Sequence, residues 1–262
     1  MGKLRLFCLM HQLSAVIITF NEEANIAVCI ESVKAIADEI LVLDSFSTDR
    51  TREICIAHGV RFEQHAFDGH IQQKNRAKNL AKYQWVLSLD ADEKPSEQLI
   101  QSIQALKQNP LNLADGYVMN RLNFFCGKPI KTCGWYPDRK LRLWKKDSGE
   151  WTGVNPHDRF ELHVGKKQLF LHGDILHNTY PTRNQMIAQM NKFARIAAGE
   201  LKHKPTIVLL GKMMFGSVFR FLRCYFFKLG FTDGKAGLDI SLHQALEVFY
   251  KYRLALKLKN SN

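Results

Sequence analysis

Short apolar runs alternate with amphipathic segments over the first 108 residues of the chain. Compact runs rich in Val, Ile and Leu, typical of buried parallel strands, cover residues 14–20, 40–43, 60–62 and 85–89. Apolar positions at helical spacing predict helices from residue 26 onward, over about 50–58, over 72–82 and from Ser96 onward. This alternation predicts a doubly wound, largely parallel α/β sheet.

The pattern changes after residue 116. A strand is predicted over 117–122, and the stretch 127–151 is rich in Gly, Pro, Trp and Arg, as expected for short antiparallel strands and ligand-facing loops. Helices are predicted over 183–203, about 206–229 and about 239–257. We therefore expect a short leader over 1–12, a domain over 13–182 with halves 13–115 and 116–182, and a helical region over 183–262.

The N-terminal leader does not have the pattern of a signal peptide. Its apolar run is short, His11 and Gln12 interrupt it, and no small-residue cleavage site follows. Met10 is an alternative start of translation. No run reaches the roughly 18–20 uncharged apolar residues that cross a bilayer. The six cysteines form no C-x-x-C pair and no metal-ligand spacing, which predicts buried free thiols in a reducing compartment.

The net charge of +12 is concentrated in the last third of the chain. Residues 183–262 hold 14 Lys and Arg against 4 Asp and Glu, whereas residues 1–182 hold 23 against 21. A near-neutral body thus carries a basic helical region. Such a surplus suits an anionic partner such as acidic lipid, a phosphorylated glycan or nucleic acid.

The most informative polar feature follows the fourth predicted strand, where Asp90 and Asp92 are one residue apart. Side chains at i and i+2 point to the same side of an extended chain, so both carboxylates can face one ligand. Two close carboxylates repel each other without a cation, and Mg²⁺ and Mn²⁺ are commonly held by one or two carboxylates plus substrate phosphates. The pair predicts a divalent metal site; a solvated acidic turn is the alternative.

Three polar motifs at predicted strand ends together resemble the family 2 inverting glycosyltransferases of the GT-A fold. The motifs are Asn21-Glu22, Asp44-x-x-Ser47-x-Asp49-x-Thr51 and Asp90-Ala91-Asp92-Glu93. The resemblance covers residues 13–182 and implies a Rossmann-like, mostly parallel sheet flanked by helices, with antiparallel strands on the acceptor side. The nucleotide-binding half is then 13–115 and the acceptor half 116–182. No G-x-G-x-x-G or G-x-x-x-x-G-K-[ST] loop is present.

Three later stretches are similar to the lipopolysaccharide-core glucosyltransferases, which add β-glucose to an inner-core heptose. They are Gly134-Trp135-Tyr136-Pro137-Asp138, Arg142-Leu143-Trp144 and Asn155-Pro156-His157. The subgroup usually has His-Glu where this chain has His157-Asp158. The Q-x-x-R-W segment of the more processive members is missing, which favours addition of a single sugar.

The resemblance implies transfer of a hexose, glucose by analogy, from a UDP-sugar. It assigns nucleotide-sugar contacts to Thr19, Asn21, Glu22, Asp44, Lys74, Arg76, Asp90 and Asp92. Asp44 would accept a hydrogen bond from the uracil N3–H. Asp92, with Asp90 in a ribose or metal-shell role, would hold Mg²⁺ or Mn²⁺ bridging both phosphates, and His157 and His177 are further candidates for the metal shell. Asp49 is expected to cap a helix rather than bind a ligand.

Inversion by direct attack needs one carboxylate that takes the proton from the acceptor hydroxyl. We expect Asp138, in a loop with Pro and aromatic neighbours, to be this base, with Asp158 and Glu161 as alternatives. Trp135 and Tyr136 are expected to contact the acceptor sugar, since aromatic rings suit sugar faces. Arg139 and Arg142 are expected to meet an acceptor phosphate.

The expected partners are a UDP-sugar, a lipopolysaccharide core acceptor and an anionic membrane surface, with no nucleic acid beyond the nucleotide. The basic C-terminal region favours a cytoplasmic protein that is peripheral on the cytoplasmic face of the bacterial inner membrane. Another surface glycan or a lipid-linked acceptor is the alternative within the same fold. A basic nucleic-acid-binding protein is the non-enzyme alternative, and it leaves the carboxylate series unexplained. The donor sugar, the linkage and the oligomeric state stay open.

Overall fold

A computed structural model describes residues 12–108, 114–155 and 157–260, with the side chains of His157 and Asn260 outside this description. The expected leader therefore lies outside the described residues except for Gln12. Two compact units make up the chain. Unit 1 is formed by Met1–Arg121 with Arg139–His177, and unit 2 by Leu122–Asp138 with Asn178–Asn262.

The unit boundary differs from the expected division at residue 182. Residues 122–138, expected in the acceptor half, belong with the C-terminal helices. The physical reason is apolar packing, because Ile130 and Cys133 are buried in one cluster with Cys224 and Ile240.

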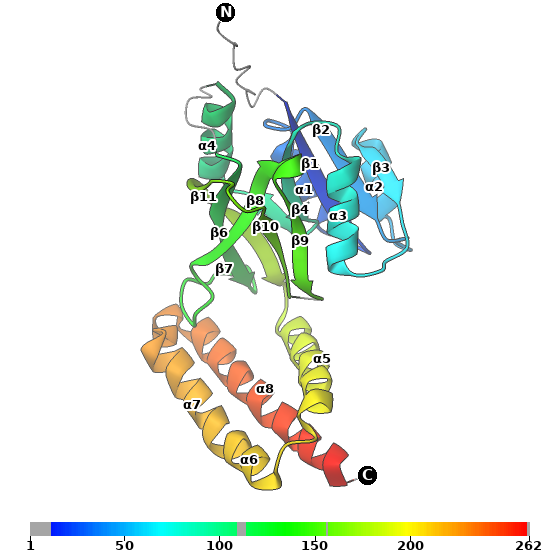
Figure 1. Cartoon of the computed structure of the whole chain (residues 1–262). Coiled ribbons are helices and arrows are strands. Elements are labelled where there is room, and N and C mark those ends of the chain that lie inside the picture. The colour runs from blue at the N-terminus through cyan, green and yellow to red at the C-terminus, as the bar shows by residue number, and fades with distance from the viewer. Residues whose placement is uncertain (1–11, 109–113, 156, 261–262) are drawn as a thin grey trace, which may run out of the picture. The chain divides into compact units, whose positions relative to one another are not determined.

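The first half of the sheet in unit 1 is parallel and doubly wound (Figure 1). Its strands are β1 (Leu13–Thr19), β2 (Glu39–Asp44), β3 (Arg61–Gln64) and β4 (Trp85–Asp90), in the order β3-β2-β1-β4. The helices α1 (Ile26–Val33), α2 (Thr51–Ala57) and α3 (His70–Leu80) connect them. Gly59 lies just after the end of α2 and has a left-handed backbone (φ +68°), as is common for a glycine that ends a helix. The predicted fold class is confirmed.

The second half of the sheet brings in the antiparallel strands that the sequence predicted. They are β5 (Glu93–Pro95), β6 (Gly116–Phe125), β8 (Asp138–Lys145) and β11 (Gln168–Tyr180), with the short β7 (Lys128–Pro129) on β6. β8 pairs antiparallel with β4, and β5 with β11. A separate two-stranded sheet contains β9 (Gly149–Val154) and β10 (His157–Leu162), preceded by the 3₁₀ turn η1 (Lys146–Ser148).

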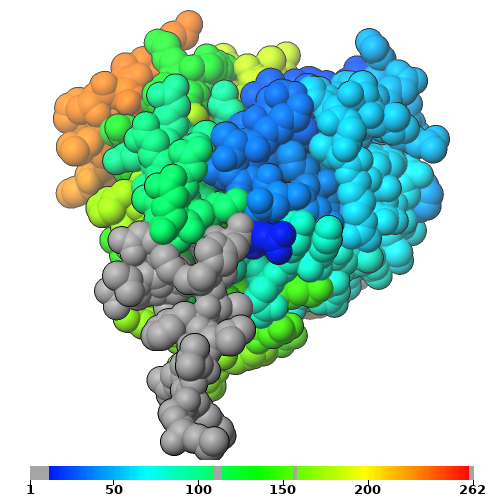
Figure 2. Space-filling view, turned by 90° about the horizontal axis from the view of Figure 1, so that it is seen from above, coloured from blue at the N-terminus to red at the C-terminus, as the bar shows by residue number. Residues whose placement is uncertain are grey.

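Both faces of the sheet in unit 1 are covered. On one face α1 and α4 (Glu97–Gln108) bury Ile30 and Leu99 against the strands. On the other face α3 and the β9–β10 pair enclose a second cluster, in which Trp144 stacks on Phe160 at a centroid distance of 3.9 Å. Figure 2 shows unit 1 from above. The blue-to-cyan segments from β1 to α3 form one side of it, and the green segments lie beside them. Buried on both faces, the strands read as continuous apolar runs.

Unit 2 is built on two long helices, α5 (Arg183–Leu201) and α8 (Lys235–Asn260), which pack along each other. Thr182 and Gln185 form a capping box at the start of α5. The predicted helix over 206–229 is instead interrupted. It consists of α6 (Thr206–Gly211), the π turn η2 (Lys212–Gly216), α7 (Ser217–Leu222) and the π turn η3 (Arg223–Phe227), followed by the 3₁₀ turn η4 (Gly230–Asp233).

The last helix begins at Lys235, earlier than the predicted residue 239. Its first turn lies directly on η4, because a Cβ at Gly237 would come within 1.8 Å of the Gly230 carbonyl oxygen. Only glycine permits this approach. Among the helices that the structure describes, none combines the length and apolar character needed to cross a bilayer.

Candidate active site

The carboxyl ends of β1, β2 and β4 meet at the switch point of the sheet. β1 lies between β2 and β4, so the chain direction of the connections reverses there. In open α/β sheets a crevice forms outside the strand ends at such a point, and ligands bind in it. The polar motifs of the sequence follow these three strands, so the tertiary fold brings them to one edge.

The loops after β1 and β2 are fastened to each other by hydrogen bonds. Asn21 has a left-handed backbone (φ +54°), and its Oδ1 accepts from the Thr48 N–H at 2.8 Å. The Asn21 N–H donates to Ser47 Oγ at 2.8 Å, and the Glu22 N–H donates to Thr51 Oγ1 at 2.9 Å. Ser47, Thr48 and Thr51 of the Asp44-to-Thr51 motif therefore hold the loop after β2 against the loop after β1.

Replacing Asn21 tests this fastening. Asn21→Ala should lower the free energy of unfolding by about 1–2 kcal/mol, because alanine tolerates positive φ poorly and the bond to Thr48 is lost. Asn21→Gly should recover the backbone part of this loss. Urea unfolding of the three proteins measures it, and equal stability of the alanine and glycine variants would contradict the backbone contribution.

Asp44 and Thr19 lie at the ends of β2 and β1. The Asp44 carboxylate is buried and accepts from the Ser47 N–H at 2.9 Å, from the Ser47 hydroxyl and from Gln64 Nε2 at 3.0 Å. Its predicted contact to uracil stays a prediction. Thr19 is buried, and its Oγ1 has no hydrogen-bond partner among the described residues. A buried hydroxyl without a partner is costly, which favours a polar ligand atom beside it.

Asp90 and Asp92 do not face one ligand in the extended geometry that the sequence suggested. β4 ends at Asp90, and the chain turns through Ala91 and Asp92 before β5 begins. The two side chains consequently have different partners. Asp92 Oδ2 lies 3.1 Å from His177 Nε2 on β11.

Asp90 instead belongs to a buried ion-pair network. Lys74 Nζ lies 3.1 Å from Asp90 Oδ1 and 2.8 Å from Asp158 Oδ2, and Arg142 Nη2 lies 3.3 Å from Asp90 Oδ2. Burial alone raises the pKa of Asp90, but Lys74 and Arg142 outweigh it and hold that pKa far below its usual range. Burial lowers the pKa of Arg142, but the charges of Glu93, Asp90 and Asp158 outweigh it and raise that pKa above its usual range. The charge of Asp90 is therefore already neutralised by protein.

Sequence reasoning gave no role to Glu93, which the structure places at the centre of this network. Its side chain is fully buried, and Oε1 lies 3.1 Å from both Arg142 Nη2 and Arg121 Nη1. Glu93 Oε2 accepts from the Asp90 N–H at 3.1 Å. The available signal was its position directly after the Asp-Ala-Asp motif. Arg142, expected to meet an acceptor phosphate, is buried against Glu93, and its acceptor role stays a prediction.

Glu22, in the loop after β1, interacts electrostatically with the carboxylates at the end of β4. Burial raises the pKa of Glu22, and the charges of Asp92, Asp49 and Asp90 raise it further. Glu22 and Asp92 therefore lie near each other although 70 residues separate them in sequence. Asp49 accepts from the N–H groups of Thr51 and Glu23, each at 3.0 Å, but it lies one residue before the N-cap position of α2, which is Arg50, so it is not the N-cap residue itself.

Three other predicted residues, Arg76, Arg139 and Glu161, have other neighbours. Arg76 pairs with Asp68 at 3.0 Å, and Arg139 is exposed, with its guanidinium 5.7 Å from the Phe170 ring centre. Glu161 is exposed on β10 and pairs with Arg159. Trp135, Tyr136 and Asp138 belong to unit 2. The predicted metal contact of His157 falls on a side chain outside the described residues.

The residues present fit a divalent cation that is completed by a substrate. Within the described ranges no group of three His, Cys, Asp or Glu side chains surrounds one point. Mg²⁺ and Mn²⁺ sites commonly use one or two protein carboxylates and fill the other positions with water and phosphate oxygens. Asp92 is partly exposed and pairs with His177, so its carboxylate is suited to this task.

This arrangement defines a glycosyltransferase. The model of the family "Glycosyl transferase family 2" matches residues 14–158, and the chain belongs to that family.

The relatives that match nearly the whole chain include two of particular interest. One is an uncharacterized glycosyltransferase of Rickettsia typhi, 29% identical over 96% of this chain and 90% of that protein. The other is the lipopolysaccharide core biosynthesis glycosyltransferase LpsC of Rhizobium meliloti, 26% identical over 92% of this chain and 93% of that protein. A crystal structure of glucosyl-3-phosphoglycerate synthase from Mycobacterium tuberculosis with Mn²⁺ and UDP has a TM-score of 0.36 and 23% identity, covering 44% and 45% of the two chains.

Proposed function

We propose that this glycosyltransferase transfers a hexose, with inversion, from a UDP-sugar to a lipopolysaccharide inner-core acceptor. The observation that carries the proposal is the division of labour between the two aspartates at the end of β4. Both side chains are 27% exposed, but Lys74 and Arg142 neutralise Asp90, whereas Asp92 pairs with His177 and with no Lys or Arg among the described residues. The site therefore keeps one carboxylate for a cation that accompanies a diphosphate.

The residues around the switch point would hold the nucleotide. Thr19 Oγ1 has no hydrogen-bond partner in the described part of the chain. Asn21 and Glu22 lie in the loop that follows it at the end of β1. Asp92, with His177 beside it, would hold Mg²⁺ or Mn²⁺. When bound, that ion would supply Lewis-acid stabilisation of the charge that develops on the leaving diphosphate. Lys74 acts as a positioning residue, since it fixes Asp90 and Asp158 in one place.

The acceptor class rests on the sequence motifs and on the likeness to LpsC. LpsC is named for lipopolysaccharide core biosynthesis and matches this chain over almost its full length. Glucose as the sugar and heptose as its acceptor are the specific forms that we propose. Another surface glycan or a lipid-linked acceptor would use the same donor site.

A transfer screen tests the proposed function. Purified full-length protein is incubated with single UDP-sugars, Mn²⁺ and dephosphorylated or native core oligosaccharide, and products are identified by mass spectrometry. UDP-glucose should give one added hexose per acceptor. In parallel, UDP with Mn²⁺ should raise the melting temperature, as a ligand of the native state does. No shift and no product with any UDP-sugar would overturn the proposal.

The catalytic base is a separate prediction. Asp158 is held by Lys74 at 2.8 Å and Glu161 pairs with Arg159 on an exposed strand, so both carboxylates are committed to cations. We keep Asp138 as the base because it ends the Gly134-to-Asp138 stretch, in which Pro137 and the aromatic residues Trp135 and Tyr136 precede it. Asp138→Asn should lower kcat by about 10²–10⁴-fold and leave UDP affinity within twofold.

Glu161→Gln serves as the matched control and should retain the wild-type kcat. Steady-state kinetics and UDP titration measure both parameters. A near-normal rate for Asp138→Asn, together with loss of turnover in Asp158→Asn, would move the base to Asp158.

We also propose that unit 2 binds an anionic membrane surface. The segment from α6 to η4 exposes large apolar side chains, among them Ile207, Met214, Phe215, Val218, Phe219, Phe226 and Phe227. Phe215 is 77% and Phe219 62% exposed. Lys and Arg side chains on the same segment suit anionic head groups, and such a combination is typical of interfacial helices.

The double substitution Phe215→Ser and Phe219→Ser should weaken co-flotation with phosphatidylglycerol vesicles by about tenfold, because two exposed aromatic rings no longer enter the interface. Ile56→Ser removes an equally exposed apolar side chain of unit 1 and should float like the wild type. Equal flotation of all three proteins would contradict this membrane face.

A further inference from the structure

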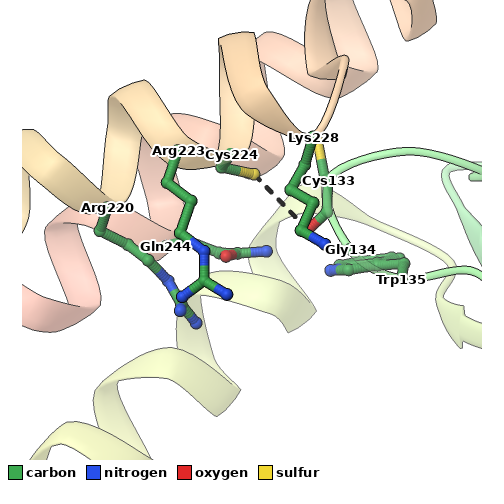
Figure 3. A pocket seen from close by; sticks show the side chains of 8 residues that line it. All are labelled: Cys133, Gly134, Trp135, Arg220, Arg223, Cys224, Lys228 and Gln244. Atoms are coloured by element: carbon green, nitrogen blue, oxygen red, sulfur yellow. Dashed lines mark hydrogen bonds between the residues drawn. The ribbon is translucent and has the colours of Figure 1, made fainter.

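Unit 2 contains a pocket of about 310 Å³, and its lining includes Trp135, which is expected to contact the acceptor sugar in the proposed function. It lies between the loop before β8, the end of α7 with η3, and α8 (Figure 3). The lining side chains that matter here are Trp135, Arg220, Arg223, Lys228 and Gln244. The thiol of Cys224 donates to the Cys133 carbonyl oxygen at 3.7 Å and helps to hold the loop against η3.

The pocket is cationic and its charges are uncompensated. Arg220, Arg223 and Lys228 have no ion pair or side-chain hydrogen bond among the residues that the structure describes, and no Asp or Glu lines the pocket. The side chains of Arg220 and Arg223 reach in the same direction beside Gln244, and the amine of Lys228 lies near Gly134 (Figure 3). Like charges one helical turn apart repel each other, so an anion between them would be stabilising.

The side chains that line the pocket indicate which class of anion it would bind. Paired guanidinium groups bind phosphate oxygens through two parallel N–H donors, and an amine adds a further point charge. Trp135 offers an aromatic surface, and its ring is part of an apolar cluster with Tyr180. Aromatic rings suit the face of a sugar or the start of an acyl chain. Arg223 and Cys224 also open the π turn η3, a rare geometry that is frequent at functional sites.

We propose that this pocket binds a phosphomonoester. The phosphoryl group would lie between Arg220, Arg223 and Lys228, and the group that it esterifies would lie against Trp135. Two sources share this chemistry, a phosphorylated sugar of a glycan and the phosphomonoester head group of phosphatidic acid. The pocket is independent of the donor site, so binding should be the same in the Asp92→Ala variant.

Calorimetric titration of the full chain with glucose 6-phosphate, glucose and inorganic phosphate tests the proposal. Glucose 6-phosphate should bind and glucose should not. Arg223→Gln should weaken binding by about tenfold, since one charge-assisted bidentate contact is lost. Lys212→Gln is the matched control, because it removes the same charge from an exposed position of the same segment outside the pocket.

A second arm measures flotation with vesicles that contain phosphatidic acid. If Arg223→Gln affects the phosphosugar and not the vesicles, the source is a glycan; the reverse result assigns a lipid head group. The proposal is overturned if neither probe distinguishes Arg223→Gln from Lys212→Gln, or if chloride at equal ionic strength displaces the phosphosugar as well as phosphate does.

Discussion

Asp92→Ala should lower the rate of sugar transfer at least about a thousandfold while the protein stays folded. Asp92 is a partly exposed carboxylate at the end of β4, and in our proposal it binds the cation that stabilises the leaving diphosphate. Loss of such stabilisation is worth several kcal/mol in the transition state. The side chain belongs to no buried network, so its removal should shift the melting temperature little. Steady-state transfer assays with Mn²⁺ and thermal unfolding measure the two quantities.

The UDP thermal shift provides a second readout for the same variant. Wild-type protein should be stabilised more by UDP with Mn²⁺ than by UDP with EDTA, whereas Asp92→Ala should lose that difference. Asp38→Ala is a matched control, since Asp38 is also a partly exposed aspartate with one cationic partner, Lys107, and it precedes β2 rather than following a strand end of the proposed site. Transfer at a near-normal rate by Asp92→Ala would remove the basis of the metal site.

Glu93→Ala should have the largest effect on stability. Its carboxylate is fully buried and lies 3.1 Å from the guanidinium groups of Arg142 and Arg121. Removal of one partner of a buried ion pair leaves an uncompensated charge, and this costs about 3–5 kcal/mol. Such a loss is a large part of the 5–15 kcal/mol that typically separates folded from unfolded states.

Glu93→Gln keeps the volume and one hydrogen-bond acceptor, so it should be less destabilised than Glu93→Ala and should remain measurable if the alanine variant fails to fold. Glu161→Ala is the control, because its carboxylate is exposed, and its unfolding midpoint should stay close to that of the wild type. Urea unfolding followed by circular dichroism gives the free energies. Equal stability of Glu93→Ala and Glu161→Ala would contradict the network.

Much of the fold could be predicted from the sequence because unit 1 follows local rules. Strands buried on both faces read as unbroken apolar runs, and the helices between them repeat apolar residues every three or four positions. The prediction of one regular helix over 206–229 was wrong, because the π turns η2 and η3 interrupt the segment. A π turn has no apolar period of its own, and periodicity therefore does not reveal it.

The candidate site was predicted in its members and not in their arrangement. Asp90, Asp92, Lys74 and Asp158 were all identified, but the sequence suggested two aspartates directed at one ligand. The chain turns at Ala91 and Asp92, so the two carboxylates have different partners, and only the fold brings Lys74 between Asp90 and Asp158. Glu93 received no role because burial of a charge depends on residues distant in sequence, here Arg121 and Arg142.

The amino-acid sequence by itself determined the α/β class, the positions of the polar motifs after the strands and the basic character of the C-terminal helices. These properties are local, since each depends on residues within a few positions of one another. Only the tertiary structure decided which carboxylate is neutralised by Lys and Arg, which one pairs with His177, and that residues 122–138 join unit 2. Those outcomes depend on distances between segments far apart in the chain, and no local pattern encodes them.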